Sequence, residues 1–205
     1  MADDFTIDIA GHELEYIDEE HIYLVDGVIV PSITQIVRTK DPDKYGAVSE
    51  AVLKRAADAG TAVHEAVEDY AMTGKDNGLP EVRGFRFLQK HYRFKVEAVE
   101  VPVILFDEGE PLAAGRLDMV IRNDKGELGL ADIKRTSALD KNYLAYQLNL
   151  YRKAYIQDYG ADITHLAGLH LREEVRKYVP IPIVEDLADE LISEYFNNEN
   201  GGNEE

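Results

Sequence analysis

The chain has 205 residues, of which 45% are apolar, and its formal net charge is −18. This size suits one domain with a buried core, and no apolar run approaches the roughly 18 residues that indicate a membrane-spanning helix. Because cysteine is absent, disulfides, thiol nucleophiles, cysteine-ligated zinc and iron–sulfur clusters are excluded. The acidic start has no signal-peptide core, so we expect a cytoplasmic protein.

The negative charge is concentrated at the two ends. Residues 1–26 contain nine acidic residues and 178–205 contain eight, and neither segment has a Lys or Arg. The middle segment, 27–177, holds 23 acidic and 22 basic residues. It is therefore nearly neutral and compatible with a phosphate backbone, above all when cations bind. The Gly- and Asn-rich segment 197–205 is expected to be a disordered tail.

Turn signals and periodicity predict alternating helices and strands. Short strands are expected over 12–30, within a β-hairpin extension at 1–45, with Ser32 as the cap of a following helix. A helix is expected over 49–73, although Gly60 lies inside it and asks for a reason such as close approach by another group. The remaining elements are a helix at 80–94, strands at 98–106, 112–122 and 127–134, a helix at 141–158, strands near 164–172 and 177–183, and an amphipathic helix at 184–196.

This order of elements is αβββαβ. The helix between the third and fourth strands suits a crossover connection, so we expect an α/β fold with a mixed central β-sheet flanked by helices. We expect one domain over 1–196 with its core at about 46–183.

The hairpin over 112–134 carries the most informative side chains. A type I turn at 123–126 with Gly126 in the left-handed region would place Asp118 opposite Asp132. Alternation then puts both aspartates and Lys134 on one side of the sheet. The side chains expected to point into a core on the other side are Leu117, Met119, Ile121, Ala131 and Ile133.

Two facing carboxylates need compensation when they are partly buried. Their repulsion is roughly 3 kcal/mol at an effective dielectric of 20. A divalent cation that prefers oxygen ligands, Mg²⁺ or Mn²⁺, would supply the missing positive charge. The alternative is a solvated checkerboard in which Arg116 and Lys134 form weak exposed ion pairs with Asp118 and Asp132.

Two helical segments add further polar side chains. Gly60, His64 and Glu68 fall on one helical stripe, and Gln147 and Tyr151 lie four residues apart on another helix. A single histidine is more often structural than a ligand. The segment HEAVE lacks the second histidine of the zinc-protease pattern, so that motif is rejected.

Taken in order, these pieces resemble the PD-(D/E)XK nuclease superfamily, and within it the RecB-like exonucleases that include phage enzymes. The resemblance covers about 21–183 and includes the stretch HIYLVDGVIVPSITQIV. The matching pieces are Gly60-x-x-x-His64, Glu100, Gly115-x-x-Asp118, Asp132-Ile133-Lys134 and Gln147-x-x-x-Tyr151.

The resemblance implies a metal site. His64, Asp118 and Asp132 would bind one or two Mg²⁺ or Mn²⁺ ions together with the backbone carbonyl of Ile133. Glu100 would contribute through the metal or its waters. Members of this branch that hold an iron–sulfur cluster use four cysteines, so no such cluster is expected here.

The resemblance also implies catalytic and DNA-binding roles. Lys134 would orient or help to deprotonate the attacking water, with Asp118, Asp132 and Glu100 completing the catalytic set. As a base, Lys134 would need its ordinary pKa of about 10.4 to be lowered. Gln147 and Tyr151 would hold the DNA strand or shape the site.

A basic stripe is predicted on the helix at 80–94. Arg83, Arg86, Lys90 and Arg93 fall at i, i+3, i+7 and i+10, and no acidic residue occurs from 82 to 96. Such a stripe favours contact with a DNA backbone. Its alternative interpretation is an ordinary solvated face.

These observations predict a metal-dependent DNA nuclease, most simply an exonuclease acting at linear or single-stranded ends in DNA recombination, repair or phage DNA processing. Two other functions remain open: an acidic DNA mimic that inhibits a DNA-binding protein, and a nucleic-acid-binding member of the same fold that does not cut. The sequence leaves open the polarity of digestion, the preference for DNA or RNA, the oligomeric state and any protein partner.

Overall fold

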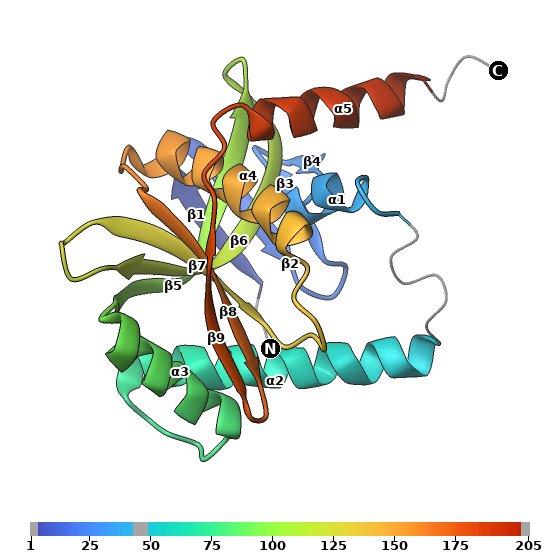
Figure 1. Ribbon diagram of the computed structural model, residues 1–205. Helices are drawn as coiled ribbons and strands as arrows, with labels where there is room; N and C mark the ends of the chain where they lie inside the picture. The colour runs from blue at the N-terminus through green and yellow to red at the C-terminus, as the bar shows by residue number, and fades with distance from the viewer. Residues whose placement is uncertain (1–3, 43–48, 202–205) are drawn as a thin grey trace.

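The computed structural model describes residues 4–42 and 49–201, and these form an α/β protein with two sheets (Figure 1). The first sheet is antiparallel, in the order β1-β2-β3-β4, and the second is mixed, in the order β5-β6-β7-β8-β9. The strands are β1 (Phe5–Ile9), β2 (His12–Ile17), β3 (Ile22–Val25), β4 (Val28–Val30), β5 (Lys95–Asp107), β6 (Glu110–Arg122), β7 (Leu128–Lys134), β8 (His165–Arg172) and β9 (Val175–Ile181).

The helices pack against the two faces of the five-stranded sheet. Residues of α2 and α3 join one buried cluster, and residues of α1, α4 and α5 join the cluster on the opposite face. Helix α4 connects β7 to β8, which are parallel, so the predicted crossover is confirmed. The helices are α1 (Ile33–Arg38), α2 (Glu50–Thr73), α3 (Pro80–Tyr92), α4 (Lys141–Tyr159) and α5 (Leu187–Gly201).

Local capping chemistry accounts for several boundaries. Ser32 caps α1 through a reciprocal capping box with Gln35. Ser49 precedes α2, and Gly74 ends that helix with a φ of 76°, a left-handed conformation that glycine adopts without a steric penalty. The expected helix at 49–73 is thereby confirmed.

The structure corrects two helix boundaries. Helix α3 ends at Tyr92 instead of 94, because Arg93 turns into the left-handed region (φ 53°) before β5 begins. Arg93 is therefore not the fourth member of a helical stripe. Helix α5 begins at Leu187 instead of 184 and continues to Gly201, into the segment expected as a tail, while 202–205 lie outside the described residues.

The N-terminal extension is larger than the strands predicted over 12–30. Strand β1 pairs with β2 across a turn in which Ala10 and Gly11 both have positive φ. The described part of this extension ends at residue 42, so the expected start of the core near 46 falls outside the described residues. Within the described ranges no helix is both long enough and apolar enough to cross a lipid bilayer.

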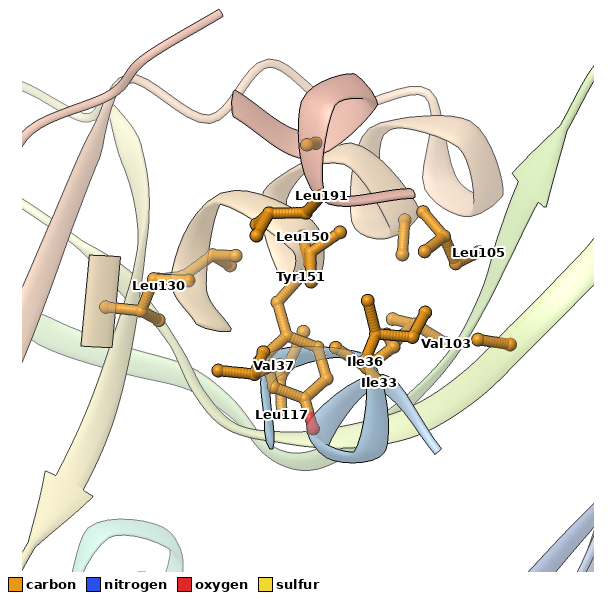
Figure 2. Packing of buried hydrophobic residues seen from close by; sticks show 14 of the residues in the cluster. Ile33, Ile36, Val37, Val103, Leu105, Leu117, Leu130, Leu150, Tyr151 and Leu191 are labelled. Atoms are coloured by element: carbon orange, nitrogen blue, oxygen red, sulfur yellow. The ribbon is translucent and has the colours of Figure 1, made fainter. Parts of the chain in front are cut away.

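The buried side chains fall into three clusters. The largest joins α1, α4 and α5 to one face of the second sheet, and Figure 2 shows Ile36, Leu117, Tyr151 and Leu191 within it. The second lies under α2 and α3. The third joins the N-terminal sheet to the β5–β6 pair.

One residue lies on the opposite face from the one predicted. Met119, Ile121 and Ala131 pack under α2 and α3 as expected, but Leu117 packs in the cluster of α1 and α4. Strict alternation fails between Leu117 and Met119, opposite the point where Glu100 on β5 has a φ of 50°. At this point the strand pair changes the face that it buries: Val101 and Leu117 belong to the cluster of α1 and α4, and Val99 and Met119 belong to the cluster under α2 and α3.

Asp158 gives a pH-dependent contribution to stability. Its Oδ2 accepts a hydrogen bond from the Ile104 backbone N–H at 2.7 Å, and burial raises the pKa of this carboxyl to about 7. The folded protein thus holds this proton more tightly than the unfolded chain. This contribution favours folding below about pH 4 and is lost as the pH rises towards 7.

Replacing Asp158 with asparagine is expected to remove this loss, since the amide oxygen still accepts from Ile104. The free energy of unfolding of the variant minus that of the native protein should rise by about 1–2 kcal/mol when the pH is raised from roughly 5 to 8. This figure allows for partial solvent screening. Urea denaturation at both pH values measures this. The exposed Asp8→Asn is the control, and an equal pH dependence in the native protein and Asp158→Asn would contradict the interpretation.

Candidate active site

The turn between β6 and β7 sets the register of the site. Asn123 N donates to Glu127 O and Gly126 N donates to Asn123 O, both at 3.0 Å, and Gly126 has a φ of 86°. The ladder pairs Val120 with Leu130 and ends at Met119 with Ala131. The predicted turn and register are confirmed up to that point.

Beyond the last β6–β7 pair, a side chain of β6 accepts the backbone hydrogen bond from β7 that a backbone carbonyl would otherwise accept. Asp118 Oδ2 accepts a hydrogen bond from the Ile133 backbone N–H at 2.6 Å. The same oxygen lies 3.5 Å from His64 Nδ1 on α2. The end of the ladder therefore fixes Asp118 at the point where α2 meets the hairpin.

The buried Asp132 forms an ion pair with the partly buried Lys134 beside this point. Lys134 Nζ lies 2.7 Å from Asp132 Oδ2, and the Asp132 side chain is 4% exposed. The angle of this contact leaves Oδ2 without an aligned hydrogen bond from any described residue. Because Asp132 is buried and Asp118 is only 13% exposed, the solvated checkerboard is wrong.

Burial and neighbouring charge shift both protonation equilibria. Burial raises the pKa of Asp132 to about 6, although the Lys134 ammonium opposes the shift. Burial alone would lower the pKa of Lys134, but the carboxylates of Asp132 and Asp118 outweigh it and raise the pKa. Lys134 is therefore an ammonium at neutral pH in this arrangement, not a proton acceptor.

Glu100 on β5 and Arg116 on β6 are two further polar residues of the site. Arg116 pairs with Glu100, and its guanidinium lies 5.3 Å from the ring of Tyr16 and 5.9 Å from the ring of Phe5. Both rings belong to the N-terminal sheet. Arg116 therefore links that sheet to the predicted site residue Glu100 by a cation–π contact on one side and an ion pair on the other.

Glu68 is a member of the site that the expected set of site residues lacked. One of its oxygens, Oε1, is buried without a hydrogen bond from any described residue. Burial raises the pKa of Glu68 to about 8, and the charges of Glu100 and Asp118 add to the shift. The sequence signal was its position one turn after His64, on the stripe that begins at Gly60.

His64, Glu68, Glu100 and Arg116 line a cleft between α2 and the N-terminal sheet. The cleft has a volume of about 780 Å³. Its lining residues are Tyr16, Asp18, His21, Ala57, Gly60, Thr61, His64, Glu65, Glu68, Glu100 and Arg116. A second hollow of about 560 Å³ shares Glu100 and Arg116 and contains Asp118. A Cβ on Gly60 would meet nothing within 4 Å, so the glycine leaves that wall of the cleft open.

Tyr151, on α4, forms the inner side of the second hollow beside Asp118. Tyr151 is buried in the largest cluster (Figure 2). A Cβ on Gly115 would lie 3.0 Å from the Tyr151 ring, so the glycine gives the ring its space beside Asp118. Gln147 is also buried. Tyr151 shapes the site from beneath, and contact with a DNA strand remains a prediction for both residues.

The four predicted basic residues lie outside the lining of the cleft. Arg83, Arg86 and Lys90 are exposed on α3, while Arg93 lies beyond its end. Arg83 donates to the Gly78 carbonyl at 2.6 Å, and Arg93 lies 3.9 Å from Asp124. The structure therefore does not bring this group together with His64, Asp118 and Asp132.

The carboxylates and the imidazole of the site are residue types that suit a divalent cation. In this structure, however, Asp118 contacts His64 and Asp132 contacts Lys134. Among the described residues, no three His, Asp or Glu side chains already form a group that could hold a metal ion. Asp118 is bonded to Ile133 and Asp132 to Lys134. Two buried carboxylate oxygens without hydrogen bonds, on Glu68 and Asp132, nevertheless mark a site with too little positive charge.

Comparison with protein-family models finds no match, and comparison with curated proteins finds none. A search of solved structures finds the crystal structure of SSO0001, with 17% identity, 83% of this chain and 77% of that chain covered, and a TM-score of 0.48.

Proposed function

We propose that the chain is a metal-dependent DNA nuclease, most simply an exonuclease of the PD-(D/E)XK type that the sequence resembles. The observation that carries the proposal is the gathering of four acidic residues at two hollows that share Glu100: Glu68 lines one, Asp118 lines the other, and Asp132 lies beside Asp118 with the partly buried ammonium of Lys134 next to it. Acidic groups so close together cost free energy, because partial burial weakens the screening between those that are ionised and raises the pKa of Glu68 and Asp132. Such unfavourable clusters of acidic groups are typical of functional sites.

Mg²⁺ or Mn²⁺ suits this donor set. His64, Asp118 and Asp132 would hold the ion, with the backbone of Ile133 beside them, and Glu68 and Glu100 would hold its waters. Two present contacts must open for this, because Asp132 now pairs with Lys134 and Asp118 lies against His64. When bound, the ion supplies an activated water and neutralises charge on the phosphate.

The chain's own residues would do the rest. Lys134, held as an ammonium by Asp132 and Asp118, would donate to a phosphate oxygen and stabilise the charge that grows there. The open wall at Gly60 and Thr61 leaves room for the sugar–phosphate strand. Arg116 would keep Glu100 turned towards the cleft from its place against Tyr16.

The test is hydrolysis of linear and covalently closed single-stranded DNA by the full chain. We expect Mg²⁺ or Mn²⁺ to support degradation of the linear strand, chelation to stop it, and the circle to survive. Degradation of both forms would show that the enzyme is an endonuclease and not an exonuclease, because a closed circle has no end. No turnover of either form with either ion would contradict the proposal. Full inhibition of a DNA-binding protein by Asp118→Ala, without turnover, would support the acidic DNA mimic instead.

A further inference from the structure

A cluster of aromatic rings lies where α3 meets β9, outside the lining of the cleft. Five aromatic rings run from α3 to β9. Phe87 stacks on His91 with centroids 5.6 Å apart, and Tyr92 stacks on Tyr178 at 4.4 Å, with Phe94 6.0 Å from Tyr178. Phe87 and Tyr92 are 47% and 45% exposed. Two large aromatic residues are therefore about half exposed to solvent on one surface, which is typical of an interaction site.

Two adjoining hollows flank these rings. One, of about 440 Å³, is lined by Tyr92, Phe94, Tyr178, His165, Asn123 and Pro180 among others. The other, of about 520 Å³, is lined by four cations, Lys90, Arg93, Lys95 and Arg122. Both include Phe94 and Asn123. An aromatic hollow therefore joins directly onto a cationic one.

The charge of this surface is opposite to that of the whole chain. Segments 82–96 and 175–183 contain no acidic residue, although the net charge is −18. Two acids at the rim, Asp124 and Glu97, pair with Arg93 and Arg122. Lys90 and Lys95 form no ion pair with any residue in the described ranges, so their charges are available to a partner.

We propose that these two hollows bind a single-stranded nucleic acid. A base stacks on the Tyr92–Tyr178 pair, and the neighbouring phosphates lie over Lys90, Arg93 and Lys95. Stacking on aromatic rings combined with a basic groove is how proteins hold unpaired strands with little sequence preference. Double-stranded nucleic acid fits less well, because its bases are stacked on one another and do not expose their faces.

The surface is separate from the cleft but within reach of the same strand. Arg122 lies opposite Leu128 at the start of β7, and Asp132 lies roughly 13 Å further along that strand at 3.3 Å per residue. This is at most about four nucleotide steps, at the 3.4 Å rise of a fully stacked strand. The surface would hold one part of a strand while another part lies in the cleft, yet its binding does not depend on cleavage.

Fluorescence anisotropy with labelled oligothymidylate, measured on the full chain in EDTA, tests the proposal. Tyr92→Ala and the double variant Lys90→Glu/Lys95→Glu are each expected to weaken binding roughly tenfold. Phe196→Ala and Lys75→Glu, an exposed ring and an exposed cation elsewhere, serve as matched controls and should bind as the native protein does. Native-like melting confirms that each variant folds.

Photocrosslinking with iodouracil in the same oligonucleotide locates the contact. Crosslinks on Tyr92 or Tyr178 are expected. Native affinity in both test variants, crosslinks confined to cleft residues such as Tyr16, or displacement of the oligonucleotide by an acidic peptide but not by unlabelled DNA would each overturn the proposal. Because EDTA removes the divalent cations that cleavage would need, a failure of these measurements is distinct from a failure to detect nuclease turnover.

Discussion

Asp118→Asn is expected to reduce cation-supported DNA turnover by at least roughly 100-fold while leaving the protein folded. The asparagine oxygen still accepts the hydrogen bond from the Ile133 N–H, so the local backbone should keep its shape. The lost negative charge removes a hard oxygen ligand and with it the anchoring of the ion. Initial rates on end-labelled linear DNA, at saturating Mg²⁺ or Mn²⁺, measure the effect.

Glu110→Gln is the matched control for this loss. Glu110 is exposed at the start of the same strand, β6, so its neutralisation changes the charge of the chain equally but lies away from the cleft. We expect the native rate in this variant. A rate for Asp118→Asn equal to that of Glu110→Gln would remove Asp118 from the catalytic set.

Glu68→Gln is expected to have opposite effects on stability and on cation binding. Without a cation and above about pH 8, where Glu68 is ionised, the variant loses a buried carboxylate that is repelled by Glu100 and Asp118, so its melting temperature in EDTA should rise at that pH. With a cation, it loses a group that holds the ion's waters, and the affinity for Mn²⁺ should fall by roughly 10- to 100-fold. Thermal melts and calorimetric titration measure the two effects.

The exposed Asp58→Asn on the same helix is the control for Glu68→Gln. It should change neither the melting temperature in EDTA nor the affinity for Mn²⁺. A Glu68→Gln protein that is less stable in EDTA and binds Mn²⁺ with native affinity would show that Glu68 is a structural residue that takes no part in the site.

The sequence predicted the parts of the site that depend on local rules. Turn chemistry at 123–126 determines the β6–β7 register, because Gly126 is suited to the left-handed position. That register brings Asp118 to Asp132 without any long-range information. The helical spacing of Gly60, His64 and Glu68 was equally readable, since residues four apart share a face.

The remaining features depend on contacts between distant segments. The positive φ at Glu100 has no local signature, and neither has the change of face at Leu117 on the paired strand. The contact between Arg116 and Tyr16 requires the N-terminal sheet to pack on β6, which periodicity does not encode. The importance of Glu68 emerged only from its burial beside Glu100 and Asp118.

The most direct test of the proposed metal site is a crystal grown with Mn²⁺ and measured for anomalous scattering. We expect an anomalous peak about 2.0–2.2 Å from carboxylate oxygens of Asp118 and Asp132, with His64 turned towards it and the Lys134–Asp132 ion pair opened. A Mn²⁺ peak elsewhere in the molecule, with these ion pairs unchanged at a saturating concentration, would contradict the account.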